Sequence, residues 1–131
     1  VGGATIIPTV AKHEEDFIHT QRGDCCGFLV RVAGVTLWDT GDTELLDEHL
    51  KVSHPDVLLL PEAPHIISLD DAARLANATR ARHVAPCHYG TFDSDLYWCA
   101  GDPAPLTTRI EDARRRYHVL SIGEKLVIPA R

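Results

Sequence analysis

The sequence lacks several features that would place it in other classes of protein. It contains no methionine, and no apolar run approaches the roughly 18 residues that a membrane-spanning helix requires. Its N-terminus lacks the pattern of a secretory signal peptide. Its 13 Lys and Arg are outnumbered by 19 Asp and Glu, giving a net charge of −6. We therefore expect a cytoplasmic protein that binds neither membranes nor nucleic acids, because nucleic acids require a basic surface.

The four cysteines do not have the spacing of a disulfide framework. No Cys-x-x-Cys occurs, and the side chains of adjacent cysteines on a strand point to opposite faces. We expect free, buried or half-buried thiols at Cys25, Cys26, Cys87 and Cys99. Cys87 differs from the others because it directly precedes a candidate metal ligand, His88.

The sequence opens at Val1-Gly2-Gly3, almost directly in an expected strand. Together with the absence of methionine, this opening suggests a processed product, one part of a split protein or a truncated reading frame. The length of 131 residues suits one domain, and no change in composition divides it. We therefore expect residues 1–131 to form a single domain.

Apolar runs and helical periodicities alternate along the sequence, which predicts the α/β class. The expected strands are Val1–Pro8, Gly27–Val32, Val35–Trp38, Asp56–Leu60 and Arg82–Pro86, with a hairpin turn at Ala33-Gly34. Helices are expected over Thr43–Val52, from Ser68 onward and over Thr107–Arg116, and a closing hairpin over His118–Ile122 and Lys125–Pro129. Ser68 is expected to cap its helix, with Asp71 in the reciprocal capping position. The long irregular segment Phe92–Pro105 is typical of a lid or substrate wall.

Three of the expected strands end in a turn or loop that holds a potential metal ligand. The strand ending at Trp38 leads to Asp42, the strand ending at Pro86 leads to His88, and the first strand leads to His13. Active sites of α/β proteins lie at the carboxyl ends of the strands. This arrangement predicts a metal-dependent enzyme.

Each of these residues also has a purely structural interpretation. Asp42 could cap a helix that begins near Thr43, and an isolated histidine such as His88 or His13 is often only a satisfied polar residue. Asp39 lies three residues before Asp42 and could take the same role. The remaining histidines have no fixed pair spacing and are treated as background: His19, His49, His54, His65, His83 and His118. Neither H-x-H-x-D-H nor H-E-x-x-H occurs.

The order of four segments resembles the metallo-β-lactamase superfamily, in particular the branch typified by the L-ascorbate-6-phosphate lactonase. Leu37–Thr43 is similar to the Gly-Asp-Thr/Ser element of that superfamily. Three further segments follow in the same order: Pro55–Pro61, the helix over Ser68–Arg80, and Val84–Phe92. The resemblance runs from about Ile6 to Pro129, yet it covers only the C-terminal half of the family's fold.

The resemblance implies half of an αββα sandwich, with a mixed sheet that carries helices on one face. It implies that Asp42 bridges two metal ions, that His88 binds one and His13 the other, and that Asp42 and His88 are catalytic. Zinc or manganese is implied, with iron as a further candidate. Tyr89 and Thr91 would face a small ester, lactone or phosphodiester substrate, and Asp39 would support a ligand.

The family's H-x-H-x-D-H motif would lie upstream of Val1, so the count of ligands in this sequence is too low for a complete site. We consider three hypotheses. The chain is part of a metal-dependent hydrolase completed by an N-terminal half; or it is a module without turnover that acts by dimerisation or binding; or it is an unrelated α/β domain. Uncovered sheet edges and an uncovered apolar face would favour association with itself or with the complementary half.

Overall fold

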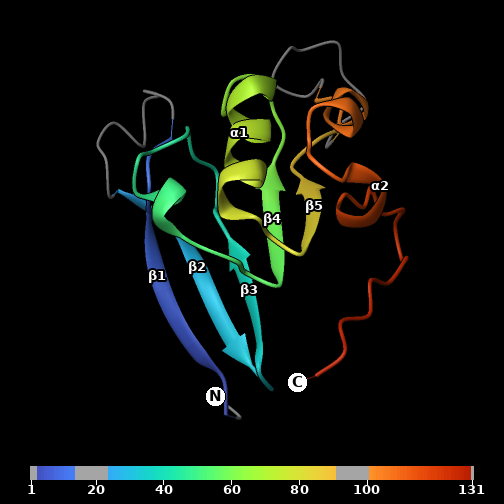
Figure 1. Cartoon of the computed structure of the whole chain (residues 1–131). Coiled ribbons are helices and arrows are strands. Elements are labelled where there is room, and N and C mark those ends of the chain that lie inside the picture. Colours follow the sequence, from blue (N-terminus) through green and yellow to red (C-terminus); the bar gives the residue numbers. More distant parts are fainter. Residues whose placement is uncertain (1–2, 14–23, 91–100, 131) are drawn as a thin grey trace.

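In the computed structural model, which describes residues 3–13, 24–90 and 101–130, five strands form one mixed sheet (Figure 1). Their order in the sheet follows the sequence: β1 (Thr5–Ala11), β2 (Cys25–Val32), β3 (Val35–Asp39), β4 (Val57–Pro61) and β5 (His83–Cys87). The helices are η1 (His49–Lys51), α1 (Leu69–Thr79), η3 (Ala104–Thr108) and α2 (Ala113–Arg116), of which η1 and η3 are 3-10 helices. Among these residues, no helix is long and apolar enough to cross a membrane.

Four of the strands run in the same direction. β2 is antiparallel to both β1 and β3, whereas β3, β4 and β5 are parallel to one another. The carboxyl ends of β1, β3, β4 and β5 therefore lie along one edge of the sheet. The expected β2–β3 hairpin is confirmed, and both turn residues, Ala33 (φ 49°) and Gly34 (φ 77°), are left-handed, as this tight turn requires.

The hydrophobic core lies between α1 and one face of the sheet. Trp38, Leu58 and Val84 are neighbours across three strands and are completely buried. Helix α1 contributes the small residues Ala72 and Ala76 to the same cluster, so it lies close to the strands. The expected α/β class, with a mixed sheet and helices on one face, is thus confirmed (Figure 1).

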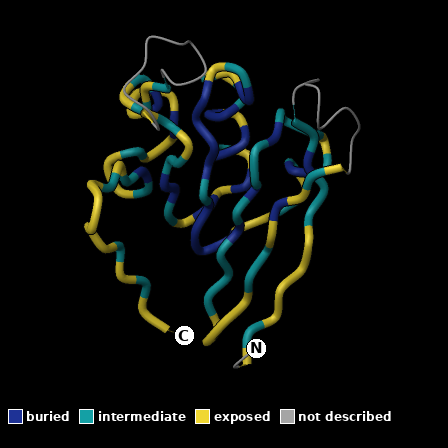
Figure 2. Tube along the Cα trace, turned by 180° about the vertical axis from the view of Figure 1, so that it is seen from behind, coloured by how far each residue is buried: buried dark blue, intermediate teal, exposed yellow. Residues whose placement is uncertain are grey.

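The opposite face of the sheet is exposed at its β1–β2 end. Residues alternate between faces along a strand, so Ile6, Phe28 and Val32 point away from the face that carries Trp38. Their exposed fractions are 55%, 43% and 46%. In Figure 2, β1 and β2 accordingly combine exposed and half-buried positions. The sheet therefore carries an apolar surface that is open to solvent.

The helix expected over Thr43–Val52 is wrong except for the short η1. Groups of this segment bond to a residue outside it: the Lys12 N–H donates to the Thr43 side-chain Oγ1 at 2.9 Å, and the Glu44 backbone N–H donates to the Lys12 carbonyl at 2.8 Å. The Leu46 N–H donates to the His49 ring at 3.2 Å. These partners take the place of the helical hydrogen bonds. No helix begins at Thr43, so the capping interpretation of Asp42 is also wrong.

The continuous helix expected over Thr107–Arg116 is also wrong, because the segment forms two shorter elements, η3 and α2. Asp112 between them adopts a left-handed backbone (φ 55°), which interrupts the helical path. The closing hairpin is not formed either. Its turn at Gly123 exists, with the Glu124 N–H donating to the Ser121 carbonyl, but the flanking residues pair in no strand beyond the bridge between Tyr117 and Val84.

The expected cap of α1 is confirmed. Ser68 has an extended backbone, and its hydroxyl accepts a hydrogen bond from the Asp71 N–H at 3.1 Å. The Asp71 carboxylate in turn accepts from the Ser68 hydroxyl at 2.9 Å rather than from the Ser68 N–H. The reciprocal contact is therefore made through side chains. It fixes the start of α1 and hence the end of the loop that joins it to β4.

Candidate functional site

A tight turn after β3 sets the position of Asp42. The Asp39 carboxylate accepts a hydrogen bond from the Gly41 N–H at 3.0 Å, which folds the chain back at the end of the strand. Gly41 has φ +66°, and a Cβ there would lie 2.8 Å from the carbonyl oxygen of Cys26. Only glycine suits this backbone and this contact. The turn therefore depends on Asp39 and Gly41 together.

The segment before His13 is attached to the same turn. The Lys12 backbone makes two hydrogen bonds, one with the Thr43 side-chain Oγ1 and one with the Glu44 N–H. An ion pair supports them, with the Lys12 ammonium 2.6 Å from the Glu44 carboxylate. His13 and Asp42 are therefore each one residue from a point where the two segments join. This connection spans the sheet edge between β1 and β3.

His88 reaches the same edge from β5. It follows the last strand residue, Cys87, and adopts a left-handed backbone with φ 58°. Its Nε2 lies 3.3 Å from Asp42 Oδ2, and the two side chains are 35% and 43% exposed. A left-handed backbone is uncommon for residues other than glycine and is often found at functional sites. The fold thus brings together two side chains that are 46 positions apart in the sequence.

His65, which the sequence patterns left as background, lies between the other two histidines. Its ring centroid is 6.0 Å from that of His13 and 5.9 Å from that of His88. We call His13, Asp42, His65 and His88 the histidine edge. His65 lies in the loop after β4, so the reasoning from strand ends applies to it as well. It was missed because it belongs to no sequence motif.

The histidine edge has donors of the type that zinc, manganese and iron prefer, namely imidazole and carboxylate. Their number and arrangement do not match a complete metal site. Within residues 3–13, 24–90 and 101–130, no group of three or more His, Cys, Asp or Glu side chains is arranged to hold a metal ion. The donor types in the described part of the chain are therefore suitable for a metal ion, but these residues alone do not form a complete site.

Of the other candidate residues, Asp39 has the defined role in the turn, whereas Tyr89 is half-buried beside His88. Thr91 lies outside the described residues. Burial, together with the nearby Asp39 and Asp42 carboxylates, raises the pKa of the Cys87 thiol to about 12, so this thiol is neutral near pH 7. Cys25, Cys26 and Cys87 are free thiols, as expected, and Cys25 and Cys87 are half-buried. The expected burial is wrong for Cys26, which is exposed because it shares the open face of β2 with Phe28; Cys99 lies outside the described residues.

Three of the background histidines have structural partners, namely His49, His83 and His118. The His49 ring is buried and accepts from the Leu46 N–H through Nδ1, so its Nε2 donates to the Val10 carbonyl at 2.8 Å. His83 Nδ1 lies 3.0 Å from His118 Nε2. Burial and His118 lower the pKa of His83, with a smaller contribution from Arg82. Both sets of contacts attach separate segments to the sheet.

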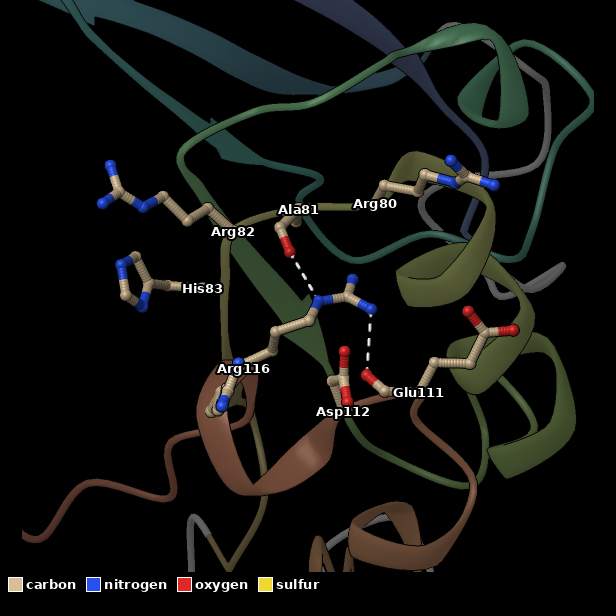
Figure 3. A pocket seen from close by; sticks show the side chains of 8 residues that line it. Arg80, Ala81, Arg82, His83, Glu111, Asp112 and Arg116 are labelled. Atoms are coloured by element: carbon tan, nitrogen blue, oxygen red, sulfur yellow. Dashed lines mark hydrogen bonds between the residues drawn. The ribbon is translucent and has the colours of Figure 1, made fainter.

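A cavity of about 660 Å³ lies at the start of β5, at the end of the strand opposite His88 (Figure 3). Arg116 occupies its centre, and its guanidinium donates to the carbonyls of Ala81, Glu111 and Ala76 at 2.7–3.0 Å. In Figure 3 the side chains of Arg80 and Arg82 point away from Arg116. The hydrogen-bonding capacity of Arg116 is thus used by the fold itself, and the cavity carries no evident chemistry.

Comparison with known proteins relates the chain to metal-dependent hydrolases. No protein-family model matches it. A UPF0173 metal-dependent hydrolase from Pyrococcus furiosus is 30% identical over 126 residues, covering 92% of this chain and 54% of the relative. One from Rubrobacter xylanophilus is 30% identical over 138 residues, covering 96% and 55%. The chain therefore spans about half the length of the curated relatives it matches.

Solved structures agree with these relatives. A metallo hydrolase from Ignicoccus hospitalis superimposes with a TM-score of 0.74 at 26% identity, over 93% of this chain and 52% of that chain. The metallo-β-lactamase fold protein YhfI from Bacillus subtilis gives a TM-score of 0.66 at 14% identity, over 92% and 48%. The second likeness concerns the fold alone. In both structures, about half of the chain has no counterpart here.

Proposed function

Because this chain belongs to the UPF0173 family of metal-dependent hydrolases and has part of the metallo-β-lactamase fold, we propose that it supplies part of the active site of such a hydrolase. The hypothesis of an unrelated α/β domain is thereby wrong. In this proposal His13, Asp42 and His88 are metal ligands. A segment equivalent to the unmatched half of the relatives supplies the remaining ligands.

The observation that carries the proposal is the contact between His88 and Asp42. The two side chains come from the ends of different strands, and their polar atoms are 3.3 Å apart on a surface open to solvent. Two exposed polar side chains gain little stability from one ion pair. Their convergence, with His13 and His65 beside them, is better explained by a shared ligand than by a contribution to folding.

A bound divalent metal would polarise a carbonyl or phosphoryl oxygen and lower the pKa of a bound water. The residues of this chain have a positioning role. The Asp39–Gly41 turn directs Asp42, and the backbone bonds of Lys12 to the same turn fix the approach of His13. We propose zinc or manganese as the metal, with iron also compatible with these donors, and an ester, lactone or phosphodiester as the substrate.

The metal can be tested on the chain itself. We expect Asp42→Ala and His88→Ala each to weaken zinc affinity in equilibrium dialysis by roughly tenfold or more, since each removes a direct ligand. His54→Asn is the matched control, because His54 is exposed, precedes β4 at the end of the strands opposite the histidine edge, and has a left-handed backbone that asparagine tolerates. Unchanged zinc affinity in both alanine variants would contradict the proposed ligands.

Turnover is tested after addition of a polypeptide that corresponds to the unmatched half of the Pyrococcus furiosus relative. We expect hydrolysis of a chromogenic phosphodiester or of a lactone only when both polypeptides and a divalent metal are present. The reaction should be lost with Asp42→Ala and kept with His54→Asn. Equal rates with the intact site and with Asp42→Ala would exclude a catalytic role for this carboxylate.

The exposed apolar face of β1 and β2 favours a second candidate function, in which the chain is a binding module without turnover. Ile6, Phe28 and Val32 would then be covered by a second copy of the chain. The two functions make opposite predictions for the mass of the species that the chain forms in solution and for its hydrolytic activity.

A further inference from the structure

A second, smaller cavity lies beside the loop that joins β4 to α1. It has a volume of about 380 Å³ and is enclosed by that loop, the start of α1 and the segment that begins at Gly101. Its walls combine apolar and acidic residues, the main ones being Pro64, Ile67, Leu69, Pro105, Glu62 and Asp102. No arginine, lysine or histidine is among the described residues that line it. Within the described part of the chain, the lining is therefore apolar with two carboxyl groups and no cationic side chain.

Glu62 is the unusual member of this lining. It follows β4 directly and is only 4% exposed. Among the described residues, its Oε2 atom has no hydrogen-bond partner. Transfer of a carboxylate from water to such a position is unfavourable unless a partner compensates for the lost hydration. A buried carboxyl group that lines a cavity thus indicates a ligand with a hydrogen-bond donor or a positive charge.

The surroundings hold this carboxyl group in place. A Cβ at position 101 would lie 2.2 Å from the Glu62 carbonyl oxygen and 2.7 Å from Oε2, so Gly101 allows the later segment to close over Glu62. Tyr117 fastens that segment, since its hydroxyl donates to the Pro103 carbonyl at 3.0 Å. The wall opposite Glu62 is therefore anchored to the core through Tyr117, which is 9% exposed.

Asp102 supplies the second charge. It is exposed, and its Oδ1 accepts from the Ala104 N–H at 2.9 Å, which fixes the carboxylate on the 101–105 segment. Burial, and then the negative charge of Asp102, raise the pKa of Glu62 to about 7, while the Asp102 N–H partly opposes this shift. The two carboxyl groups therefore lie close enough to repel each other. A cation placed between them would relieve this repulsion.

We propose that this cavity binds a small organic ammonium group, with Glu62 and Asp102 as its charged partners and Pro64, Ile67, Leu69 and Pro105 as the walls for its apolar part. An ammonium group donates up to three hydrogen bonds and pairs with carboxylates. A calcium ion is less suitable because it takes six to eight oxygen ligands and has no use for apolar walls. The loop that carries Glu62 also carries His65 of the histidine edge. A substrate with an ammonium group in this cavity would therefore lie near the histidine edge.

The test compares a charged probe with a neutral one of the same shape. Binding of cyclohexylammonium and of cyclohexanol to the full chain is followed by chemical shifts in nuclear magnetic resonance, in metal-free buffer at pH 8.5. We expect cyclohexylammonium to bind at least roughly tenfold more tightly, as a charge-assisted hydrogen bond implies. We also expect weaker binding at pH 5.5, because Glu62 is then protonated and neutral.

Two variants locate the site. Glu62→Gln and Asp102→Asn each keep the shape of the side chain and remove one charge, and each should weaken cyclohexylammonium binding by about tenfold. Asp47→Asn is the matched control, because Asp47 is exposed and outside the cavity. If Glu62→Gln fails to fold, as judged by circular dichroism, Asp102→Asn decides the question, since its side chain is exposed.

Three results would overturn the inference: equal binding of the two probes, no binding of cyclohexylammonium, or unchanged binding in both variants. Displacement of the probe by millimolar calcium, with the same loss in both variants, would assign the cavity to a metal ion and also overturn it. None of these measurements uses a bound metal or turnover. The inference and the proposed hydrolase function can therefore fail independently.

Discussion

At the scale of single residues, the turn between Asp39 and Asp42 depends on a position where a side chain cannot be placed. We expect Gly41→Ala to lower the free energy of unfolding by about 1–3 kcal/mol, because alanine would adopt a strained left-handed backbone and its Cβ would meet the Cys26 carbonyl. Urea unfolding followed by circular dichroism measures the change.

The control for that substitution is Gly123→Ala. Gly123 is also left-handed, with φ +83°, but a Cβ there would meet nothing within 4 Å. The control therefore carries the backbone strain without the steric contact and should lose only about 1 kcal/mol. Equal losses for the two variants would mean that the contact with Cys26 contributes nothing to the turn.

Local sequence patterns select some of the candidate residues and not others. Asp42 and His88 stand next to a glycine turn and a strand end, so local patterns were enough to select them. His65 and Glu62 lie in a loop without a motif, and their proximity to other polar groups exists only once β4 and β5 are paired. Local sequence carries no information about such long-range neighbours.

At the scale of secondary-structure elements, Arg116 connects three of them. Its guanidinium donates to the carbonyl of Ala76 in α1. It also donates to the carbonyls of Ala81 before β5 and Glu111 before α2, as Figure 3 shows. We expect Arg116→Ala to lower the free energy of unfolding by about 2–4 kcal/mol, because several charge-assisted hydrogen bonds are lost together. Thermal and urea unfolding provide the measurement.

Arg115→Ala is the control, since Arg115 is the exposed neighbour and lines the same cavity. Its replacement should change stability by no more than about 0.5 kcal/mol, as is usual for a surface position. If both arginine variants unfold alike, the three carbonyl contacts of Arg116 do not stabilise the fold.

Two expected helices are wrong, and contacts of the segments concerned explain why. The Thr43–Val52 segment has helical spacing, yet its polar groups bond to Lys12 and to His49 instead. The Thr107–Arg116 segment is divided at Asp112, where a left-handed residue redirects the chain toward β5. In both cases tertiary contacts outweigh helix propensity, which amounts to less than about 1 kcal/mol per residue.

At the scale of the whole molecule, the open face of the sheet calls for a partner. We expect Phe28→Asp to abolish the association that covers this face, because a carboxylate cannot be buried there without a partner charge. Light scattering after size-exclusion chromatography would detect a dimer of the chain, and the same method with the complementary half would detect a mixed complex.

Ile122→Asp is the control, because Ile122 is fully exposed and lies in the C-terminal segment rather than in the sheet. It should leave the mass of every species unchanged. A mixed complex that is active and lost with Phe28→Asp favours the hydrolase, whereas a dimer of the chain without activity favours the binding module. Association that is insensitive to Phe28→Asp would mean that another surface is used.

The sequence by itself determined the pattern of the molecule: the succession of five strands along the chain, the β2–β3 hairpin, the cap of α1 and the placement of Asp42 and His88 after strands. These features follow from local periodicity and turn chemistry, which neighbouring residues decide among themselves. Tertiary structure alone decided which side chains meet. The 3.3 Å contact of His88 with Asp42, the place of His65 and the burial of Glu62 arise from the pairing of distant strands, whose geometry no local segment contains.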